Sequence, residues 1–423
     1  MDRYGFLKTA AAIPSVRVAD CAYNGERIAA LVAEAAGRGV EVVLFPELSV
    51  TGYTCGDLFL QPALLAAAEQ TLAELLRRTA ELNTAFVVGL PVAVDDMLYN
   101  CAVVAAAGEV LGVVPKCHIP DYAEFYESRW FASGQGRPTV EIELCGQSVP
   151  FGPDLLFDIG GARCAVEICE DLWVPAPPSA EAATAGAEVI LNLSASPETV
   201  GKSDYVRQLV VQQSARTRAA YLYCSAGFGE SSTDLVFAGH ALVAENGAVL
   251  AASERFSLGE QLVVADVDCQ LLRNDRCRTT TFRHSGAGGR TTVAVTMPVA
   301  YDRPFDRTVE AMPFVPAEDD RRHSRCEEIL NIQATGLARR LAHTRSTKAV
   351  VGISGAHQYI AVSYHAGTHS LAVHDGNGQI RYIKHLYIVE SIAYAGNLAA
   401  KGAHYLFLTF CGVSPWERFH LGT

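Results

Sequence analysis

A cysteine between two acidic residues ends a short apolar stretch of this chain, in the sequence AVEICEDLWVP at residues 165–175. The carboxylates of Glu167 and Glu170 would disfavour a thiolate at Cys169 unless they point away from the sulfur. A nucleophilic thiol needs a base that removes its proton, and donors for the oxyanion that follows its attack on a carbonyl. Other parts of the chain must supply both.

Two further apolar runs end in a reactive group that follows a proline. Residues 41–45 lead to Glu47, and VLGVVPKCH places Lys116 in the same way. Active groups of open α/β sheets gather at strand ends, so these side chains could meet Cys169. Lys116 would favour the thiolate and, with the backbone N–H of Glu170, could bind an oxyanion, while Glu47 could carry the thiol proton to leaving ammonia. The trio suits amide cleavage through a thioester.

The simpler interpretation of each residue is structural. A cysteine is often a small buried hydrophobic residue, and a glutamate or lysine at a strand end is usually a solvated loop residue. Only the coincidence of three such strand ends favours chemistry.

The elements that would position these groups alternate between strands and helices over residues 1–270. Continuous apolar runs predict buried strands at residues 41–45, 85–90, 101–108 and 188–193. Apolar residues every three or four positions predict helices at residues 24–39 and 63–82. Gly and Asn-Gly pairs in AAGEVLG and VAENGAV predict hairpins. Together these signals predict a layered α/β domain in which helices cover a sheet.

Residues 271–324 are polar, rich in Pro and Gly and weakly periodic, which predicts a linker or surface arm. A helical pattern resumes at residues 325–343, and a strand-like run follows at 348–354.

The composition bounds the class of protein. A chain of 423 residues favours one large domain with an appendage, and a net charge of −12 argues against a nucleic-acid-binding protein. We expect no membrane segment, because no apolar run approaches the ~18 residues of a span. The twelve cysteines show no zinc-like spacing, so we expect no metal site and, without a secretion signal, reduced thiols in the cytoplasm.

Three segments resemble the motifs of the nitrilase superfamily, whose members use a Glu–Lys–Cys triad: FPELSVTGY, VPKCHIPDYAEFYESRWF and VEICEDLW. The sequence is more similar still to one branch, the glutaminase domain of bacterial glutamine-dependent NAD synthetases, which residues 192–243 match nearly end to end. Residues 329–355 look like the start of the synthetase domain of that branch. The resemblance covers residues 1–355.

By matching position, the resemblance implies that Cys169 is the nucleophile, Glu47 the base and Lys116 the cation beside the oxyanion. Glu124 matches the additional glutamate that supports the triad in the superfamily.

Tyr122, Ser196 and Lys202 match positions that bind glutamine in this branch. Lys202 and the Ser196 hydroxyl could hold the α-carboxylate of glutamine. From the residues alone, Ser196 could instead be a turn residue before Pro197, and Lys202 could be a surface charge at the start of a helix.

The family implies an α-β-β-α sandwich that pairs with another copy, so a homo-oligomer is expected. Its glutaminase step needs no cofactor. The synthetase half has a doubly wound sheet that binds ATP, Mg²⁺ and deamido-NAD. Ammonia from glutamine then converts deamido-NAD and ATP to NAD, AMP and pyrophosphate, with glutamate as the other product.

The resemblance stops near residue 355. The family's ATP site opens with Ser-Gly-Gly-x-Asp-Ser, in which glycines approach the pyrophosphate and the Asp serves the metal. This chain keeps Ser354 and Gly355 as a doubtful remnant of that site and continues with Ala-His-Gln-Tyr. Residues 356–423 also hold seven of the twelve histidines. We expect this tail to be an out-of-frame or mis-joined segment, so that the chain keeps the glutaminase half of a truncated synthetase.

Three alternatives stay open. A stand-alone amidase or carbamoylase of the superfamily would be indifferent to substitution of Lys202. A non-catalytic subunit would form no thioester on Cys169. A histidine-rich metal site in the tail would use His365 and His369, the pair with the closest ligand spacing.

Overall fold

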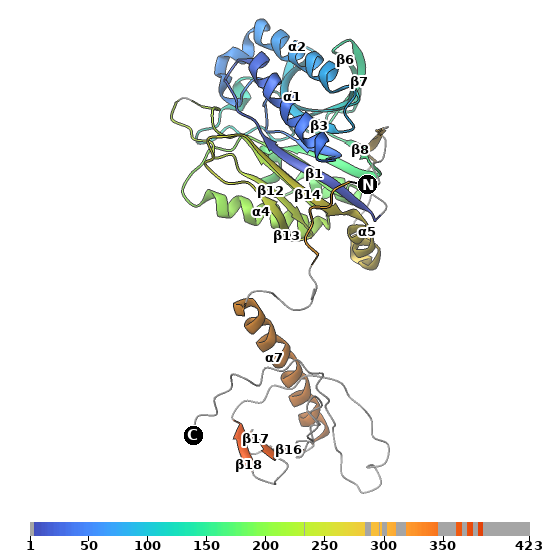
Figure 1. Cartoon of the computed structure of the whole chain (residues 1–423), viewed down its shortest axis with the longest axis vertical. Coiled ribbons are helices and arrows are strands. Elements are labelled where there is room, and N and C mark those ends of the chain that lie inside the picture. The colour runs from blue at the N-terminus through green and yellow to red at the C-terminus, as the bar shows by residue number, and fades with distance from the viewer. Residues whose placement is uncertain are drawn as a thin grey trace. The chain divides into compact units, whose positions relative to one another are not determined.

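The computed structural model describes residues 4–231, 233–283, 289–295, 297, 303–309, 319–345, 361–365, 370–374 and 380–383. The chain divides into two compact units, Met1–Thr308 and Val309–Thr423, and each is described by itself. Figure 1 draws the first unit in blue to yellow and the second in orange to red.

Two sheets form the centre of the first unit. The first sheet has the order β14 (Gln261–Asp268), β1 (Phe6–Ile13), β2 (Val42–Leu44), β3 (Ala85–Val94), β4 (Met97–Ala106), β5 (Glu109–Pro115), β7 (Gln147–Phe151) and β6 (Val140–Leu144). The second has the order β13 (Ala248–Ala252), β12 (Ala241–Glu245), β11 (Ala220–Ser225), β10 (Val189–Ser194), β9 (Ala162–Ile168), β8 (Leu155–Ile159) and β15 (Thr291–Ala294). Their central strands are parallel: β2 pairs with β1 and β3, and β10 with β9 and β11.

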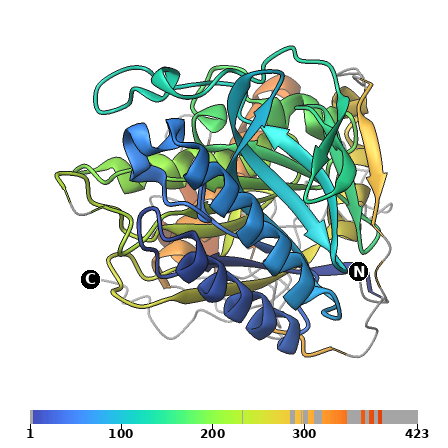
Figure 2. The same ribbon diagram turned by 90° about the horizontal axis from the view of Figure 1, so that it is seen from above.

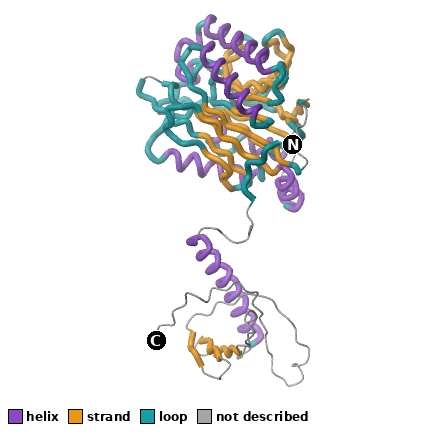
Figure 3. Tube along the Cα trace, viewed as in Figure 1, coloured by secondary structure: helices purple, strands orange, loops and turns teal. Residues whose placement is uncertain are grey.

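Helices cover both outer faces of this pair of sheets. Helices α1 (Cys21–Gly37) and α2 (Pro62–Thr79) pack side by side over the first sheet, as Figure 2 shows from above. Helices α3 (Pro178–Thr184) and α4 (Lys202–Thr217) cover the second, so that helices flank the strands in Figure 3. Helices α5 (Cys269–Arg278) and α6 (Thr280–Arg283) follow β14.

The hydrophobic cores confirm the α-β-β-α layering. Apolar residues of β1–β4 meet those of β9–β12 in one core between the sheets. Two further cores lie under the helix pairs, one on each outer face. Because both faces of β2 and β10 are covered, all their residues are buried, which explains their continuous apolar sequence.

The predicted elements agree closely with these bounds. Strands expected at 41–45, 85–90, 101–108 and 188–193 are β2, β3, β4 and β10, and the expected helices are α1 and α2. Both predicted hairpins are present, and the turn of the second places Asn246 and Gly247 at positive φ. The strand expected at 348–354 lies outside the described residues.

Of the two expectations for residues 271–324, a linker or a surface arm, the described residues up to Thr308 agree with an arm, because they belong to the first unit. Strand β15 adds to the edge of the second sheet beside β8. Residues 303–308 lie along β1 and β14, where Lys8 pairs with Asp306 at 2.7 Å. The arm also makes apolar contacts, such as that of Phe305 with Phe6, but its polar composition and weak periodicity did not predict this packing.

The second unit contains α7 (Asp319–Thr344), which includes the helix expected at 325–343. It also contains a sheet of β16 (Ala361–His365), β17 (Ser370–His374) and β18 (Ile380–Ile383). The doubly wound domain expected from residue 325 onward falls largely on residues outside the described ranges. Across the described helices, none combines the length and the apolar character that crossing a membrane requires.

Candidate active site

The site lies where strands of both sheets end. Glu47 follows β2, Lys116 follows β5, and Cys169 follows β9 as the first residue of a 3-10 turn, η3 (Cys169–Leu172). The backbone N–H of Glu47 donates to the Ser194 carbonyl at the end of β10, so the first sheet touches the second here. The structure therefore brings together the three residues that the sequence predicted as a triad.

Lys116 is fully buried between two carboxylates. Its Nζ donates to Glu47 Oε1 at 2.7 Å and to Glu127 Oε1 and Oε2 at 2.8 and 2.9 Å. Burial alone would lower the pKa of this ammonium, but Glu127 and Glu47 more than offset burial and hold that pKa well above its usual value. Lys116 is therefore a permanent cation.

Glu47 has one engaged and one available carboxylate oxygen. Oε1 accepts from Lys116 and from the Asn100 side chain at 2.7 Å. Oε2 is buried and accepts no hydrogen bond from any residue within the described ranges. Burial raises the pKa of Glu47 to about 7, against the lowering effect of Lys116. Such a group can exchange a proton near neutral pH.

The Cys169 thiol lies close enough to this cluster to feel its charges. Burial raises the pKa of Cys169 well above its usual value, and Glu47 adds to the increase. Lys116 and the backbone N–H of Ala195 act in the opposite direction without prevailing. Lys116 therefore favours the thiolate, as expected, but burial outweighs it, and the raised pKa favours a neutral thiol at rest.

The supporting carboxylate is Glu127, and this corrects the expectation for Glu124. Glu127 begins the 3-10 turn η2 (Glu127–Arg129) and is buried against Lys116, whereas Glu124 is partly exposed three residues earlier. Tyr53 also donates to Glu127, at 2.8 Å. The segment that holds both glutamates has no periodicity that would distinguish them.

The two acids beside the cysteine have different positions. Glu167 lies inside the second sheet, where it accepts hydrogen bonds from Tyr221 and from the backbone of Ser179 at 2.8 Å. Glu170 accepts from the Tyr122 hydroxyl at 3.0 Å, and burial together with Glu170 raises the pKa of Tyr122 to about 12. Glu167 thus points away from the sulfur, as expected, while Glu170 borders the site.

The other residues expected to bind glutamine lie next to segments of this site: Tyr122 contacts Glu170, Ser196 follows Ala195, and Lys202 lies beside Trp173. Ser196 is buried just after β10, where its backbone N–H donates to Ser225 at 3.1 Å. Lys202 donates to the Pro197 carbonyl at 2.8 Å, and its Nζ lies 5.6 Å from the Trp173 ring centroid. Tyr122 is 53% exposed.

Several functional candidates escaped the sequence reasoning. Asn100 and Tyr53 touch the Glu47 and Glu127 carboxylates, and the backbone of Ala195 favours the thiolate. Asn100 lies opposite Pro91 within a regular hairpin, so only its buried amide distinguishes it. No motif marks it in the sequence.

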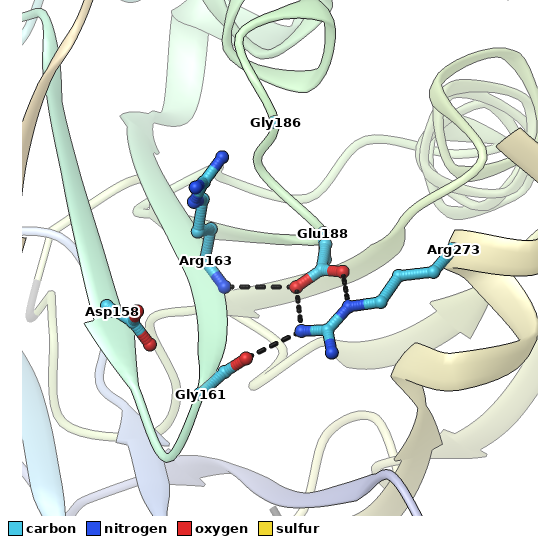
Figure 4. A pocket seen from close by; sticks show the side chains of 6 residues that line it. All are labelled: Asp158, Gly161, Arg163, Gly186, Glu188 and Arg273. Carbon is cyan, nitrogen blue, oxygen red and sulfur yellow. Dashed lines mark hydrogen bonds and ion pairs between the residues drawn. The ribbon is translucent and has the colours of Figure 1, made fainter. Parts of the chain in front are cut away.

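A depression of about 310 Å³ lies at the other end of β9 from Cys169 (Figure 4). There the Arg273 guanidinium donates to the Glu188 carboxylate and to the Gly161 carbonyl, so the two charges that line the depression already pair with each other. β9 spans seven residues, so this depression is ~20 Å from the sulfur at about 3.3 Å per residue. It does not belong to the triad site.

The remaining candidate positions concern metal and nucleotide binding. In the part of the chain that the structure describes, no cluster of three or more His, Cys, Asp or Glu side chains could hold a metal ion. Ser354 and Gly355, the expected remnant of an ATP site, and His369 lie outside the described residues.

The geometry defines a nitrilase-like protein: an α-β-β-α sandwich with a cysteine, a buried lysine and a glutamate at strand ends, and a second glutamate in a 3-10 turn. The chain belongs to the carbon-nitrogen hydrolase family, whose pattern matches residues 8–276.

Curated relatives and solved structures narrow the comparison. The chain is 44% identical to a glutamine-dependent NAD(+) synthetase of Mycobacterium tuberculosis over 84% of its own length, and 42% identical over 83% to that of Mycobacterium leprae. It spans about half of these relatives, 53% of each. A crystal structure of a glutamine-dependent NAD(+) synthetase from Cytophaga hutchinsonii matches 62% of this chain and 43% of its own, with 29% identity and a TM-score of 0.57.

An amidase of the nitrilase superfamily from Nesterenkonia matches 65% of this chain and 96% of its own. Its identity is 21% and its TM-score 0.50, so this likeness concerns the fold alone.

Proposed function

We propose that this chain hydrolyses the side-chain amide of glutamine through a thioester on Cys169. The observation that carries the proposal is the Glu47 carboxylate, whose Oε1 is held by Lys116 while buried Oε2 accepts no hydrogen bond from the described residues. A base with one fixed oxygen and one available oxygen beside a thiol can shuttle a proton in a fixed geometry. The names of the curated relatives support glutamine as the amide.

The acylation step follows from this arrangement. Glu47 Oε2 takes the thiol proton as the sulfur attacks the amide carbon, so a neutral resting thiol suffices. Negative charge develops on the amide oxygen, where Lys116 and the backbone N–H of Glu170 stabilise it. The C–N bond then breaks, and Glu47 returns the proton to the leaving nitrogen as ammonia.

The deacylation step uses the same groups in reverse. Water attacks the thioester carbonyl and gives a proton to Glu47, and the S–C bond breaks. The proton returns to the sulfur, which regenerates the thiol and releases glutamate. Neither step consumes a cofactor.

The charged side chains of Lys202 and Glu170 suit the α-carboxylate and the α-ammonium of free glutamine. The Lys202 ammonium donates to the carbonyl of Pro197, the residue after Ser196. It could pair with the α-carboxylate of glutamine, as the resemblance implies. Glu170, with Tyr122 on both its oxygens, offers a carboxylate for the α-ammonium. Burial raises the pKa of Glu170, so an incoming ammonium would gain a poorly solvated partner.

ATP, Mg²⁺ and deamido-NAD belong to the second half of the proposed lineage, in which ammonia completes NAD. A solved relative from Acinetobacter baumannii is a complex with ADP, which supports nucleotide use in that lineage. The residues present at 356–359 do not fit this role, because Ala, His, Gln and Tyr offer no carboxylate for Mg²⁺. We propose that this chain performs the glutaminase half without forming NAD.

Assembly and location remain proposals of the same kind. A homo-oligomer is expected from the family. The eleven described cysteines are free, which agrees with the reducing cytoplasm expected from the sequence.

Ammonia release from glutamine by the purified chain tests the proposal, with Cys169→Ala as the inactive control. We expect turnover that is independent of ATP and abolished in the control, with no NAD formed from deamido-NAD and ATP. Hydrolysis of small aliphatic amides in preference to glutamine, unaffected by Lys202→Ala, would instead favour a stand-alone amidase. NAD production would refute the expected loss of the synthetase half.

A further inference from the structure

A further buried carboxylate, that of Asp171, joins the two segments that carry the cysteine and the lysine. Asp171 lies two residues after Cys169 and is 1% exposed. Its Oδ2 accepts from the backbone N–H of Ile168 at 3.0 Å and of Cys117 at 3.4 Å. Its Oδ1 accepts from the backbone N–H and the Nδ1 of His118, at 2.9 and 2.8 Å.

These donors flank the reacting groups directly. Ile168 immediately precedes Cys169, and Cys117 immediately follows Lys116. β5 and β9 belong to different sheets, so no strand pairing fixes the distance between these two strand ends. The Asp171 carboxylate connects the two segments directly beside the reacting groups, and the hydrogen bonds from Tyr122 to Glu170 connect them farther along.

The backbone at the cysteine needs such support. Cys169 has a φ of 44°, a left-handed conformation that costs about 1 kcal/mol or more in a residue with a side chain. Surroundings must over-determine a conformation of this kind. Asp171 does so by holding the N–H of the residue just before it.

His118 balances the charge of this carboxylate. Its side chain is 25% exposed, so it can exchange protons with solvent while it contacts Asp171. The hydrogen bond to Asp171 raises the pKa of His118, and the nearby Glu170 and Glu167 act in the same direction. A buried carboxylate without a compensating partner would be costly.

We propose that Asp171, held by His118, is the positioning residue that sets the Cys169 sulfur against the Lys116 ammonium. This inference rests on the proposed function for its consequence in turnover, but its geometry concerns only the thiol and the ammonium. Asp171 touches no reacting atom. It acts through the left-handed backbone conformation at Cys169 and through the backbone that follows Lys116.

Asp171→Asn tests the proposal in the full chain, because the amide keeps the size but replaces one of the two acceptor oxygens by an NH2 donor, which would face an N–H group that Asp171 now binds. We expect kcat for glutamine to fall on the order of 10²-fold, as for a displacement of about 1 Å, with little change in KM. We also expect slower alkylation of Cys169 by iodoacetamide, measured by intact mass, because Lys116 no longer stabilises the developing thiolate. Unchanged or faster alkylation in a folded variant would overturn the proposal.

Two variants of His118, His118→Ala and His118→Gln, test the proposal if Asp171→Asn does not fold. His118→Ala should slow alkylation and kcat in the same direction, and His118→Gln, which retains an N–H donor, should restore most of the rate. Equal rates for the two variants would overturn the role of His118. His323→Gln, on the exposed surface of α7, is the matched control and should behave like the parent.

Alkylation separates this proposal from the proposed function. If the parent chain releases no ammonia from glutamine, the proposed function fails. Slower alkylation of Asp171→Asn than of the parent would still support the positioning role.

Discussion

The Lys116 ammonium donates a hydrogen bond to Oε1 of Glu47, and the two groups have different roles in the proposed mechanism. Lys116 cannot serve as a base because two carboxylates keep it protonated. Glu47 can, because burial holds its pKa at about 7. In the proposed mechanism, the Cys169 thiol, whose own pKa is raised by burial, gives its proton to Glu47 at the moment of attack.

The pH profile should report this base. Glu47 must be ionised to accept the thiol proton, and its raised pKa means that it is protonated in acid up to about pH 7. We expect kcat/KM for glutamine to rise with pH through an apparent pKa near 7 and to lose about tenfold per pH unit below it. Initial rates from pH 5 to 8 check this. A profile flat down to pH 5 would be inconsistent with Glu47 as the base.

Replacing the cation should separate catalysis from stability. Lys116→Ala should reduce kcat on the order of 10²-fold or more, as removal of an oxyanion donor does. Lys8 is equally buried but lies in the arm contact, so Lys8→Ala should lower the melting temperature and leave the rate per folded molecule unchanged. Near-normal turnover by folded Lys116→Ala would exclude the assigned role.

At the scale of elements, β3 makes room for the turn that carries Glu47. An added Cβ at Gly89 would lie 2.1 Å from the backbone nitrogen of Leu48 and 2.9 Å from the carbonyl carbon of Glu47. The Gly89 carbonyl also accepts from the Val50 N–H at 3.1 Å. Because Gly89 has no side chain, the turn that carries Glu47 can lie directly against β3.

Gly89→Ala should therefore impair the site, because the added methyl group would press on the backbone of Glu47 and Leu48. We expect the turn at Glu47 to shift, with a loss of stability of about 1–3 kcal/mol and of kcat on the order of 10²-fold. Thermal denaturation and glutamine turnover measure the two effects. Gly37→Ala is the control, since a Cβ there meets nothing within 4 Å, and it should keep full activity. Parent-like activity in Gly89→Ala would show that the turn tolerates displacement.

Elements with strong patterns could be predicted, whereas irregular segments could not. The buried strand β2 and helix α1 follow from apolar runs and a helical period, and the strand ends then predict Glu47 and Lys116. The choice between Glu124 and Glu127 depends on a short 3-10 turn. The contact of Asp171 with His118 joins two sheets, and the sequence pattern does not encode that distance.

At the scale of the molecule, an arm of charged residues completes the first unit. Arg303 is 4% exposed, pairs with Glu41 at 3.1 Å and donates to the Phe6 carbonyl at 2.6 Å. Arg307 forms two 2.8 Å hydrogen bonds with Glu245. A first unit cut at residue 270 would lose these cations from beside its buried carboxylates, which is costly.

Arg303→Ala should destabilise the first unit by about 3 kcal/mol, because it removes the cation that pairs with the buried Glu41 carboxylate. Tryptophan fluorescence during urea denaturation measures this, since Trp130 and Trp173 lie in that unit. Arg325→Ala, an exposed residue of α7, should have no comparable effect. Equal midpoints for the two variants would show that the arm does not stabilise the unit.

The most direct test of the account is the acyl group on Cys169. The chain is mixed with glutamine, quenched in acid and digested, and the peptide that contains Cys169 is weighed. We predict a γ-glutamyl adduct on that peptide, released by hydroxylamine and absent from Cys169→Ala. Ammonia release from glutamine that persists in Cys169→Ala, or an adduct on another residue, would contradict the account.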